Sequence, residues 1–487
     1  MNESLLSIYH HLPGPLRSAA ASLRGFHLRN WRFSRLTRQL VEQAREREYS
    51  SAKQWNNWQQ QRLAYVLNRA ATEVPYYRRL WSERRSRGDR SSWQYLENWP
   101  ILDKESIRAN PAAFVADDCS TRQMFKVYTS GTTGKALVLW RSRGTMRELY
   151  ALSVARSTGW HGLSRKDRWA RLGGQLVTPV YRRKPPFWVW NAALNQLYMS
   201  AYHLSPDFIP HYLDALIRYR ITYLFGYTSS IHALAQEALR LGRRDLKMKV
   251  AITYAEPLPD HQRRIIAQAF QCPVRETYGM GEIVTAASEC QAGTLHQWPE
   301  MGLVEVIEGD SAARSGEPGE FICTGLLNAD MPLIRYRVGD SGQSAAEQGN
   351  CPCSRPLPSI SVISGGSYDL LITRDGRRLF GLDTIVYNMP VRQVQIVQER
   401  LDLVRVRYVP AREFTSENGR FLIDQLQARM GRVEVALEPL EEIPRSANGK
   451  FSIQVCNIPP AERDLLFKRD NAQGFTPASR RLIAKRL

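Results

Sequence analysis

Hydrophobic positions in the first 70 residues of the chain recur at helical spacing. This spacing places apolar side chains on one face of a helix and predicts a largely helical N-terminal region. The clearest groups are Leu36, Leu40 and Val41, and then Leu63, Val66 and Leu67.

From about Phe125 onward, short apolar runs alternate with longer amphipathic stretches. The run at 223–225 precedes a stretch of helical periodicity at 231–241, and the run at 250–253 precedes another at 259–270. Such alternation predicts β–α units and largely parallel sheets. A turn-rich, mostly β section is expected after them, from about 302 to 363.

A Gly/Ser segment at 364–367 predicts a domain boundary, because the chain restarts after it with the apolar run 370–372. The remainder, to about 460, is small and α/β and ends in a charged tail. The sequence therefore predicts an α/β protein with two domains. The large N-terminal domain spans 1–368 and contains parallel sheets, and a small mobile C-terminal domain spans 369–487.

Composition and charge bound the class of protein. The 487 residues are 43% hydrophobic and 23% charged, which is typical of soluble globular proteins. No run of 18 apolar residues predicts a membrane span, and the N-terminus has no signal-peptide pattern. Seven cysteines in this length fit a reducing cytoplasm better than a disulfide framework.

The net charge of +20 favours anionic partners. Two interpretations stay open: solvated helix faces, or a surface that contacts an anionic membrane or attracts a polyanionic substrate. No motif supports nucleic-acid binding. The oligomeric state is not predicted.

A loop after the run at 125–128 combines hydroxyls, glycines and a lysine: Thr129, Ser130, Gly131, Thr132, Thr133, Gly134 and Lys135. Glycines let a backbone approach phosphate oxygens, and N–H and O–H groups can then donate to them. The loop does not match a Walker A motif, which has four residues between its glycines and Ser or Thr after the lysine. Alone, such a loop is also typical of an ordinary turn.

Three further motifs follow in order along the chain. They are 276–282 (Glu-Thr-Tyr-Gly-Met-Gly-Glu), 335–340 (Arg-Tyr-Arg-Val-Gly-Asp) and 443–450 (Ile-Pro-Arg-Ser-Ala-Asn-Gly-Lys). Together with the loop, this series resembles the adenylate-forming superfamily of acyl-CoA ligases. Segments 74–78 and 99–105 resemble its phenylacetate–CoA ligase branch and that branch's capsule-biosynthesis relatives.

The resemblance implies ATP-dependent activation of a carboxylic acid as an acyl-adenylate, with Mg²⁺ and transfer to CoA or another acceptor. It makes Glu282 a Mg²⁺ ligand, gives Lys450 a role in stabilising the adenylation transition state, and directs Lys135 and its loop to the phosphates. The expected nucleotide-binding residues are Glu256, Tyr278 (stacked on adenine), Gly279, Arg337 and Asp340 (on the ribose hydroxyls). From the sequence alone, Arg335 and Arg337 could equally face structural acids.

Four departures from the family pattern stand out. Ala136 replaces a common proline, and Tyr254-Ala255 replaces Gly-Ala before Glu256. Gly281 stands where Thr or Ser is common before the metal-binding acid. Gly366 replaces a hinge arginine, which leaves the thiol-transfer half-reaction less supported than adenylation.

A second group of residues is independent of ATP. Cys290, His296, Cys351 and Cys353 supply three thiolates and an imidazole, a donor set typical of a closed structural Zn²⁺ site. Similar positions in the phenylacetate–CoA ligase branch resemble a zinc site. Unrelated core cysteines and a polar histidine are the alternative.

The functional interpretation keeps two alternatives. One is transfer of AMP to a cofactor, and the other is a non-catalytic nucleotide-binding or scaffold protein of polysaccharide biosynthesis. The resemblance places the acyl pocket between the region 226–230 and the segments of Glu256 and Tyr278. Aromatic residues there would suit an aryl acid but could equally be sheet core.

Overall fold

The computed structural model describes residues 9–129, 137–179, 182–308, 311–314, 316–344, 351–364, 371–375, 377–379, 382–386, 389–441, 443, 453–459 and 462. The helical N-terminal region predicted from the sequence is confirmed by α2 (Gly14–Arg32), α3 (Arg35–Arg47) and α4 (Ala52–Glu73). Side-chain caps start two of them. The Ser34 hydroxyl accepts from Thr37 N, and Ser51 forms a capping box with Gln54.

An eight-stranded sheet has the strand order β10-β9-β8-β7-β6-β3-β5-β4. Strands β8, β7, β6, β3 and β5 are parallel, and β9, β10 and β4 pair antiparallel at the edges. The strands are β3 (Trp169–Gly173), β4 (Trp188–Asn191), β5 (Gln196–Ser200), β6 (Tyr223–Tyr227), β7 (Val250–Tyr254), β8 (Val274–Gly279), β9 (Ala286–Glu289) and β10 (Leu295–Gln297).

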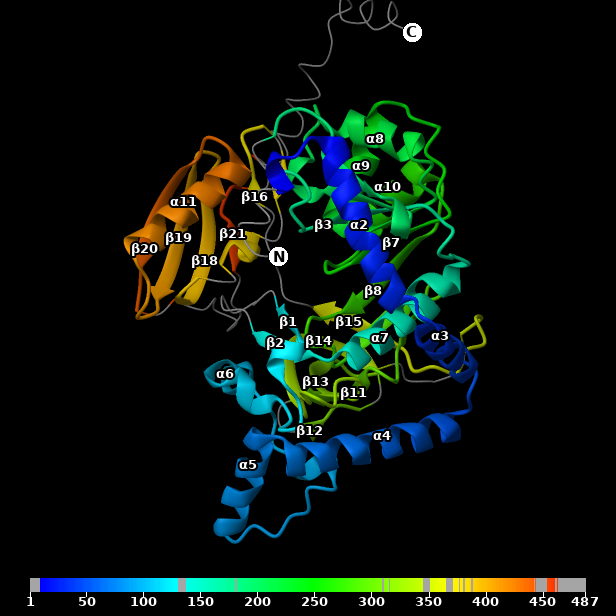
Figure 1. Cartoon of the computed structure of the whole chain (residues 1–487), viewed down its shortest axis with the longest axis vertical. Helices are drawn as coiled ribbons and strands as arrows, with labels where there is room; N and C mark the ends of the chain where they lie inside the picture. Colours follow the sequence, from blue (N-terminus) through cyan, green and yellow to red (C-terminus); the bar gives the residue numbers. More distant parts are fainter. Residues whose placement is uncertain are drawn as a thin grey trace, which may run out of the picture.

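One face of this sheet is filled by three helices, α8 (Ile209–Arg218), α9 (Thr228–Arg240) and α10 (Asp260–Phe270) (Figure 1). Their apolar residues and those of the strands form one buried cluster. The helices predicted at 231–241 and 259–270 are therefore confirmed to within three residues at each end. The predicted parallel sheet is confirmed as well.

A five-stranded antiparallel sheet forms the predicted β section. Its order is β12-β11-β13-β14-β15, and its strands are β11 (Gly302–Glu308), β12 (Ser311–Ala312), β13 (Gly319–Gly325), β14 (Tyr336–Ser344) and β15 (Ile360–Ser364). A β-hairpin of β1 (Phe125–Tyr128) and β2 (Val138–Arg141) leads into α7 (Arg143–Leu152). One buried apolar cluster joins this sheet and hairpin to the segments before them. These segments are α5 (Pro75–Ser86) and residues 99–124, which include α6 (Lys104–Ala109).

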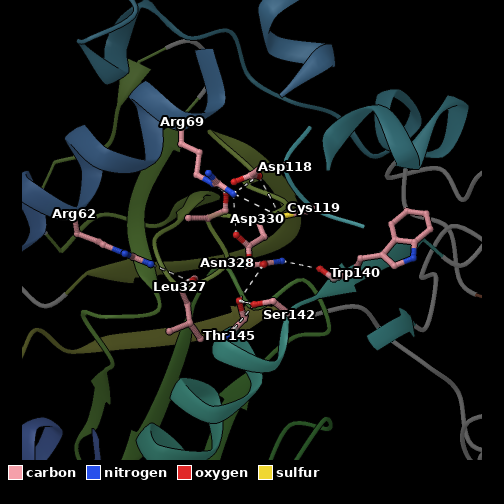
Figure 2. Close-up of polar contacts among 11 residues, drawn as sticks. Arg62, Arg69, Asp118, Cys119, Trp140, Ser142, Thr145, Leu327, Asn328 and Asp330 are labelled. Carbon is pink, nitrogen blue, oxygen red and sulfur yellow. Dashed lines mark hydrogen bonds and ion pairs between the residues drawn. The ribbon is translucent and has the colours of Figure 1, made fainter. Parts of the chain in front are cut away.

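Helix α4 fixes the segment 326–330 that supports this hairpin (Figure 2). Arg62 Nε donates to Leu326 O at 2.8 Å, and Arg69 pairs with Asp330 at 3.2 Å. From the same segment, Asn328 Nδ2 donates to Trp140 O at 3.0 Å, while its Oδ1 accepts from Thr145 at 3.3 Å. These bonds tie α4 to β2 and α7, and so hold the hairpin that carries the glycine-rich loop.

The C-terminal part contains a four-stranded sheet, order β20-β19-β18-β21, with one long helix, α11 (Ser416–Met430). The strands are β18 (Val391–Arg400), β19 (Leu403–Pro410), β20 (Glu434–Pro439) and β21 (Gln454–Cys456), preceded by the pair β16 (Leu371–Ile372) and β17 (Arg378–Leu379). This C-terminal part lies beside the large sheets (Figure 1). Buried Arg377 joins the two parts by donating to Tyr202 O at 3.0 Å and Arg429 O at 2.8 Å. The exact boundary predicted at 364–367 falls largely outside the described residues.

Candidate active site

The base of the glycine-rich loop is closed by Thr129 and Leu137. Thr129 N donates to Leu137 O, and Leu137 N donates to Thr129 Oγ1, both at 3.1 Å. Ser130, Gly131, Thr132, Thr133, Gly134 and Lys135 lie outside the described residues. A side chain at Gly281 would place its Cβ only 3.0 Å from Thr129 Cγ2. Glycine at 281 therefore lets the loop base lie directly beside Glu282.

Glu282 is partly accessible and is oriented by residues from other elements. Its Oε1 accepts from the Tyr336 hydroxyl at 2.8 Å, and Arg141 donates to the neighbouring carbonyl of Gly281. Burial lowers the pKa of Arg141 to about 10, although the charge of Glu282 opposes this shift. In the part of the chain that the structure describes, Glu282 Oε2 has no hydrogen-bond partner. A free carboxylate oxygen in this position suits a hard cation such as Mg²⁺.

The residues expected at adenine and ribose are in direct contact. The Tyr278 hydroxyl donates to Asp340 Oδ2 at 2.7 Å, although 62 positions separate them. Burial, and then the charge of Asp340, raise the pKa of Tyr278 well above its usual value, so the phenol stays protonated. Asp340 follows Gly339, whose φ of +86° suits a glycine. The structure thus brings Tyr278, Asp340 and Glu282 to one region, because β14 carries both Asp340 and Tyr336, and Tyr336 holds Glu282.

Segment 99–104 holds the arginine-rich motif in place. Leu102 N donates to Arg335 O at 2.9 Å, and Arg337 N donates to Leu102 O at 3.0 Å, which forms a short parallel bridge. Lys104 Nζ donates to Val338 O at 2.7 Å, just before Gly339 and Asp340. Segment 99–105, which carries part of the family resemblance, therefore supports the start of β14, where Gly339 and Asp340 lie.

Both arginines of this motif pair with acids. Arg335 forms an ion pair with Glu305 at 3.0 Å and donates to Trp99 O at 2.9 Å. Arg337 pairs with Asp103 at 3.1 Å and with Glu320. The sequence left open whether these arginines face phosphate or structural acids, and in the structure both face acids. A nucleotide contact of Arg337 stays a prediction.

The side chain of Glu256, a residue just after β7, binds the first turn of α9. Its carboxylate accepts from Ser229 N at 2.6 Å and from Ser229 Oγ at 2.9 Å, while Thr228 Oγ1 donates to its carbonyl at 3.1 Å. The first of these bonds satisfies one N–H group of the first helical turn. Ala255, the residue before Glu256, has φ +66°, a left-handed conformation. A nucleotide contact of Glu256 stays a prediction.

Glu276 is half-buried on β8 beside an acid–base pair. Arg263 binds Glu289 in a two-point contact at 2.7 and 2.8 Å, and Glu276 N donates to Glu289 Oε2 at 2.9 Å. Burial, and then the charge of Glu289, raise the pKa of Glu276 to about 7. The folded state therefore keeps a proton that the unfolded chain, with its carboxyl near the usual 4.5, releases.

This pKa shift predicts a pH-dependent stability. The stabilising contribution is complete below pH 4.5 and is lost as pH rises through about 7. We expect the free energy of unfolding of Glu276→Gln to fall less than that of the wild type between pH 5 and 8, by on the order of 1 kcal/mol. Urea titrations at both pH values measure this difference. The exposed Glu413→Gln variant should follow the wild type, and identical slopes for wild type and Glu276→Gln would contradict the assignment.

The four predicted metal ligands come together. One ligand atom from each of Cys290, His296, Cys351 and Cys353 lies within 4.8 Å of every other. Cys290 Sγ and Cys351 Sγ are 3.6 Å apart, and Cys353 Sγ is 3.3 Å from His296 Nε2. His296 Nδ1 is 3.1 Å from the carbonyl of Leu357, which orients the ring so that Nε2 faces the sulfurs.

Several site residues were not identified from the sequence. Tyr336 lay within a motif but received no role, and Arg141 and Lys104 were not singled out because their importance arises from contacts across more than 100 residues. Lys450 lies outside the described residues, as does Gly366.

Comparisons with known proteins identify the class. A model of the AMP-binding enzyme family matches residues 56–323, more than half of the chain, and the chain belongs to this family. A CapK C-terminal domain model matches residues 371–457. The resemblance drawn from the motifs, to the adenylate-forming superfamily and its phenylacetate–CoA ligase and capsule-biosynthesis branch, is therefore confirmed.

Individual relatives resemble the chain over most of its length. The chain is 26% identical to Protein CapK of Staphylococcus aureus over 93% of this chain and 99% of that protein. It is 25% identical to the phenylacetate-coenzyme A ligase of Thermus thermophilus, over 81% of this chain and 94% of the relative. Among solved structures, 2-hydroxyisobutyryl-CoA ligase in complex with R3-HIB-AMP matches with a TM-score of 0.52 at 19% identity, over 88% of this chain and 94% of that chain.

Within the described residues, no helix combines the length and the apolar character needed to cross a membrane.

Proposed function

We propose that this protein activates a carboxylic acid with ATP. The acid's carboxylate attacks the α-phosphorus, the bond to the β-phosphate oxygen breaks, and the products are an acyl-adenylate and pyrophosphate. The observation that carries the proposal is the convergence of Glu282, Tyr278, Asp340 and the base of the glycine-rich loop on one region, within a chain of the AMP-binding enzyme family.

Each of these groups has a part in the chemistry. Asp340 would accept from the ribose hydroxyls, with the Tyr278 hydroxyl fixing its orientation. Glu282, held by Tyr336, would bind Mg²⁺, which neutralises charge on the phosphates when bound. The glycine-rich loop and Lys135 would position the leaving pyrophosphate, and Lys450 would stabilise the charge that develops at the α-phosphate.

Transfer of the acyl group to CoA is the proposed second step. It is supported by the relatives named as coenzyme A ligases and by a solved 2-hydroxyisobutyryl-CoA ligase bound to CoA in its thioesterification state. The thiol sulfur would attack the acyl carbon and release AMP. AMP transfer to a cofactor and a scaffold role find no specific support among the described contacts. Capsule biosynthesis and peripheral contact with an anionic membrane stay predictions.

Hydroxylamine trapping tests the adenylation step. Incubation with ATP, Mg²⁺, hydroxylamine and an acid substrate is expected to yield the acyl hydroxamate, because hydroxylamine attacks the activated acyl carbon. Lys450→Ala should abolish the signal, while Lys53→Ala on the N-terminal helix α4 serves as a control and should not. Hydroxamate formation that survives Lys450→Ala would contradict the role of this lysine.

We also propose that Cys290, His296, Cys351 and Cys353 bind a structural Zn²⁺. The sulfur separation of 3.6 Å and the carbonyl behind His296 suit a closed tetrahedral site, in which Zn–S distances are about 2.3 Å. Elemental analysis of the purified protein is expected to find one zinc per chain. Cys351→Ser should lose most of it and Cys119→Ser should retain it. A zinc-free, folded wild type would contradict the proposal.

A further inference from the structure

Arg171 lies in the middle of the eight-stranded sheet, on the face opposite the helices α8, α9 and α10. In the strand register it stands beside Tyr198 of β5 and Phe225 of β6. Its neighbours along β3, Ala170 and Leu172, are fully buried and point to the helix-covered core. Arg171 therefore belongs to the other face of the sheet, among aromatic side chains.

This second face is only partly covered at its carboxyl end. Arg171, Tyr198, Phe225, Tyr227 and Tyr254 each keep partial contact with solvent, although they belong to interior strands. Arg171 is nevertheless set deep in the protein, because aromatic rings surround it. In open α/β sheets, ligands bind outside the carboxyl ends of the parallel strands, where these side chains gather.

The guanidinium of Arg171 has no acidic partner among the described residues. Its contact with the Tyr254 hydroxyl is long, at 3.5 Å, and its other contacts are with the rings of Tyr198, Phe225 and Tyr254, at 5.6–5.8 Å. Its Nε is buried without a hydrogen-bond acceptor. Buried charges in proteins are normally paired, so this arrangement leaves a charge to be matched by a ligand.

The surrounding phenols do not compensate this charge. Burial raises the pKa of Tyr198 to about 12 and raises that of Tyr227 above its usual value, so both are neutral at pH 7. A second cation lies nearby, because the positive charge of Arg171 contributes to lowering the pKa of Arg32 at the end of α2. The surroundings of Arg171 are therefore electropositive and rich in hydroxyls.

Two consecutive glycines bring these hydroxyls together. A Cβ at Gly173 would lie 2.8 Å from the Tyr254 hydroxyl and 3.1 Å from that of Tyr198. A Cβ at Gly174 would lie 3.0 Å from the Tyr227 hydroxyl, which accepts from Gly174 N at 3.2 Å. The absence of side chains at both positions lets several phenols converge beside the guanidinium.

The aromatic residues around Arg171 adjoin the proposed adenylation site. Tyr254 ends β7 two residues before Glu256, and it pairs in register with Thr277, the residue before Tyr278. Tyr227 precedes Thr228 and Ser229, which bind Glu256.

A compact acid could therefore present one carboxylate to the nucleotide while its other end reaches Arg171. The stacked rings of Phe225 and Tyr254, 4.8 Å apart, form an aromatic wall.

We propose that Arg171 and the hydroxyls of Tyr198 and Tyr254 bind a second carboxylate of the acyl donor. This inference rests on the proposed adenylation, and it names the substrate class as a compact dicarboxylic acid. The aryl acid expected from the sequence is compatible with this class if it carries a second carboxylate. Its ring would then lie against the aromatic wall, and its second carboxylate would reach the guanidinium of Arg171. A guanidinium and a carboxylate form charge-assisted hydrogen bonds, which are stronger than neutral ones.

Matched pairs of acids test the proposal. Acid-dependent pyrophosphate release is measured with phenylacetate and 4-carboxyphenylacetate, and with butyrate and glutarate. The wild type is expected to have a higher kcat/KM for the diacid of each pair, by about 10-fold or more. In Arg171→Met this preference should fall by about 10- to 100-fold. Arg168→Met, an exposed arginine just before β3, should keep the wild-type preference.

Ligand-induced thermal shift separates this inference from the proposed function. Without ATP, the diacids should raise the melting temperature of the wild type and of Arg168→Met, and not that of Arg171→Met. If Arg171→Met does not fold, Tyr254→Phe should show a smaller loss of the same preference. A diacid shift without pyrophosphate release would keep the subsite and reject the adenylation. A wild type that prefers the monoacids, or shows neither shift nor preference, would overturn the inference.

Discussion

Replacing Glu282 with glutamine is expected to lower acid-dependent pyrophosphate release about 100-fold or more. The carboxylate has a free oxygen in the described structure and lies next to the base of the glycine-rich loop. The amide is similar in size but carries no charge, and so would bind Mg²⁺ poorly. Initial rates at saturating ATP over a range of Mg²⁺ concentrations measure the effect.

Two controls make the Glu282 result specific. Tyr336→Phe removes only the hydrogen bond to Oε1 at 2.8 Å and should cost less activity than Glu282→Gln. The exposed Glu413→Gln should match the wild type. An active Glu282→Gln variant with an unchanged Mg²⁺ dependence would remove Glu282 from the metal site.

Replacing Glu300 with alanine is expected to destabilise the protein by about 3–5 kcal/mol. Glu300 receives two donors from Arg156, whose Nη2 lies 2.6 Å from Oε1, and a third from Arg47 at 3.3 Å. The side chains of Arg156 and Glu300 are 0% and 3% exposed. Removing the acid leaves a buried guanidinium without a partner. The change in unfolding midpoint, by urea or heat, measures the loss.

The comparison pair for Glu300 lies on the surface. Arg78 and Asp117 are 2.6 Å apart but 50% and 48% exposed, so Asp117→Ala should cost less than about 1 kcal/mol. The double variant Arg156→Met, Glu300→Leu should recover much of the stability lost in Glu300→Ala, because no unpaired charge remains. Equal effects of Glu300→Ala and Asp117→Ala would show that burial of the pair does not matter.

Periodicity predicted the secondary structure well where elements are long and amphipathic. The helices α9 and α10 were located because their apolar positions face one buried cluster. The end of a helix is set by capping and by tertiary contacts, which explains differences of a few residues. The start of α9 is an example, because the N–H group of Ser229 is bound by Glu256, which is distant in sequence.

Site residues that belong to a sequence motif could be predicted. Residues whose role depends on contacts between distant segments could not. Tyr278, Asp340 and Glu282 were named from motifs, and the structure brings them together. The acids that pair with Arg335 and Arg337 come from distant segments and could not be chosen from the sequence. Arg171 carries no motif. Only the strand register reveals that it shares a face with Tyr198 and Phe225.

The reason for Gly281 also became clear only in three dimensions. In the sequence it is a departure from the family pattern, because Thr or Ser is common before the metal-binding acid. In the structure, a Cβ there would approach Thr129 to 3.0 Å, so the glycine allows close packing of the loop base against the acid. The departure is thus compatible with an intact adenylation site.

Pyrophosphate release by the purified full-length protein tests the central claim most directly. The reaction contains ATP, Mg²⁺ and a panel of mono- and dicarboxylic acids, with and without CoA. The account predicts release that depends on a particular acid and is lost in Glu282→Gln, with a further rise when CoA is present. A protein that binds ATP but releases no pyrophosphate with any acid, with or without CoA, would contradict carboxylate activation.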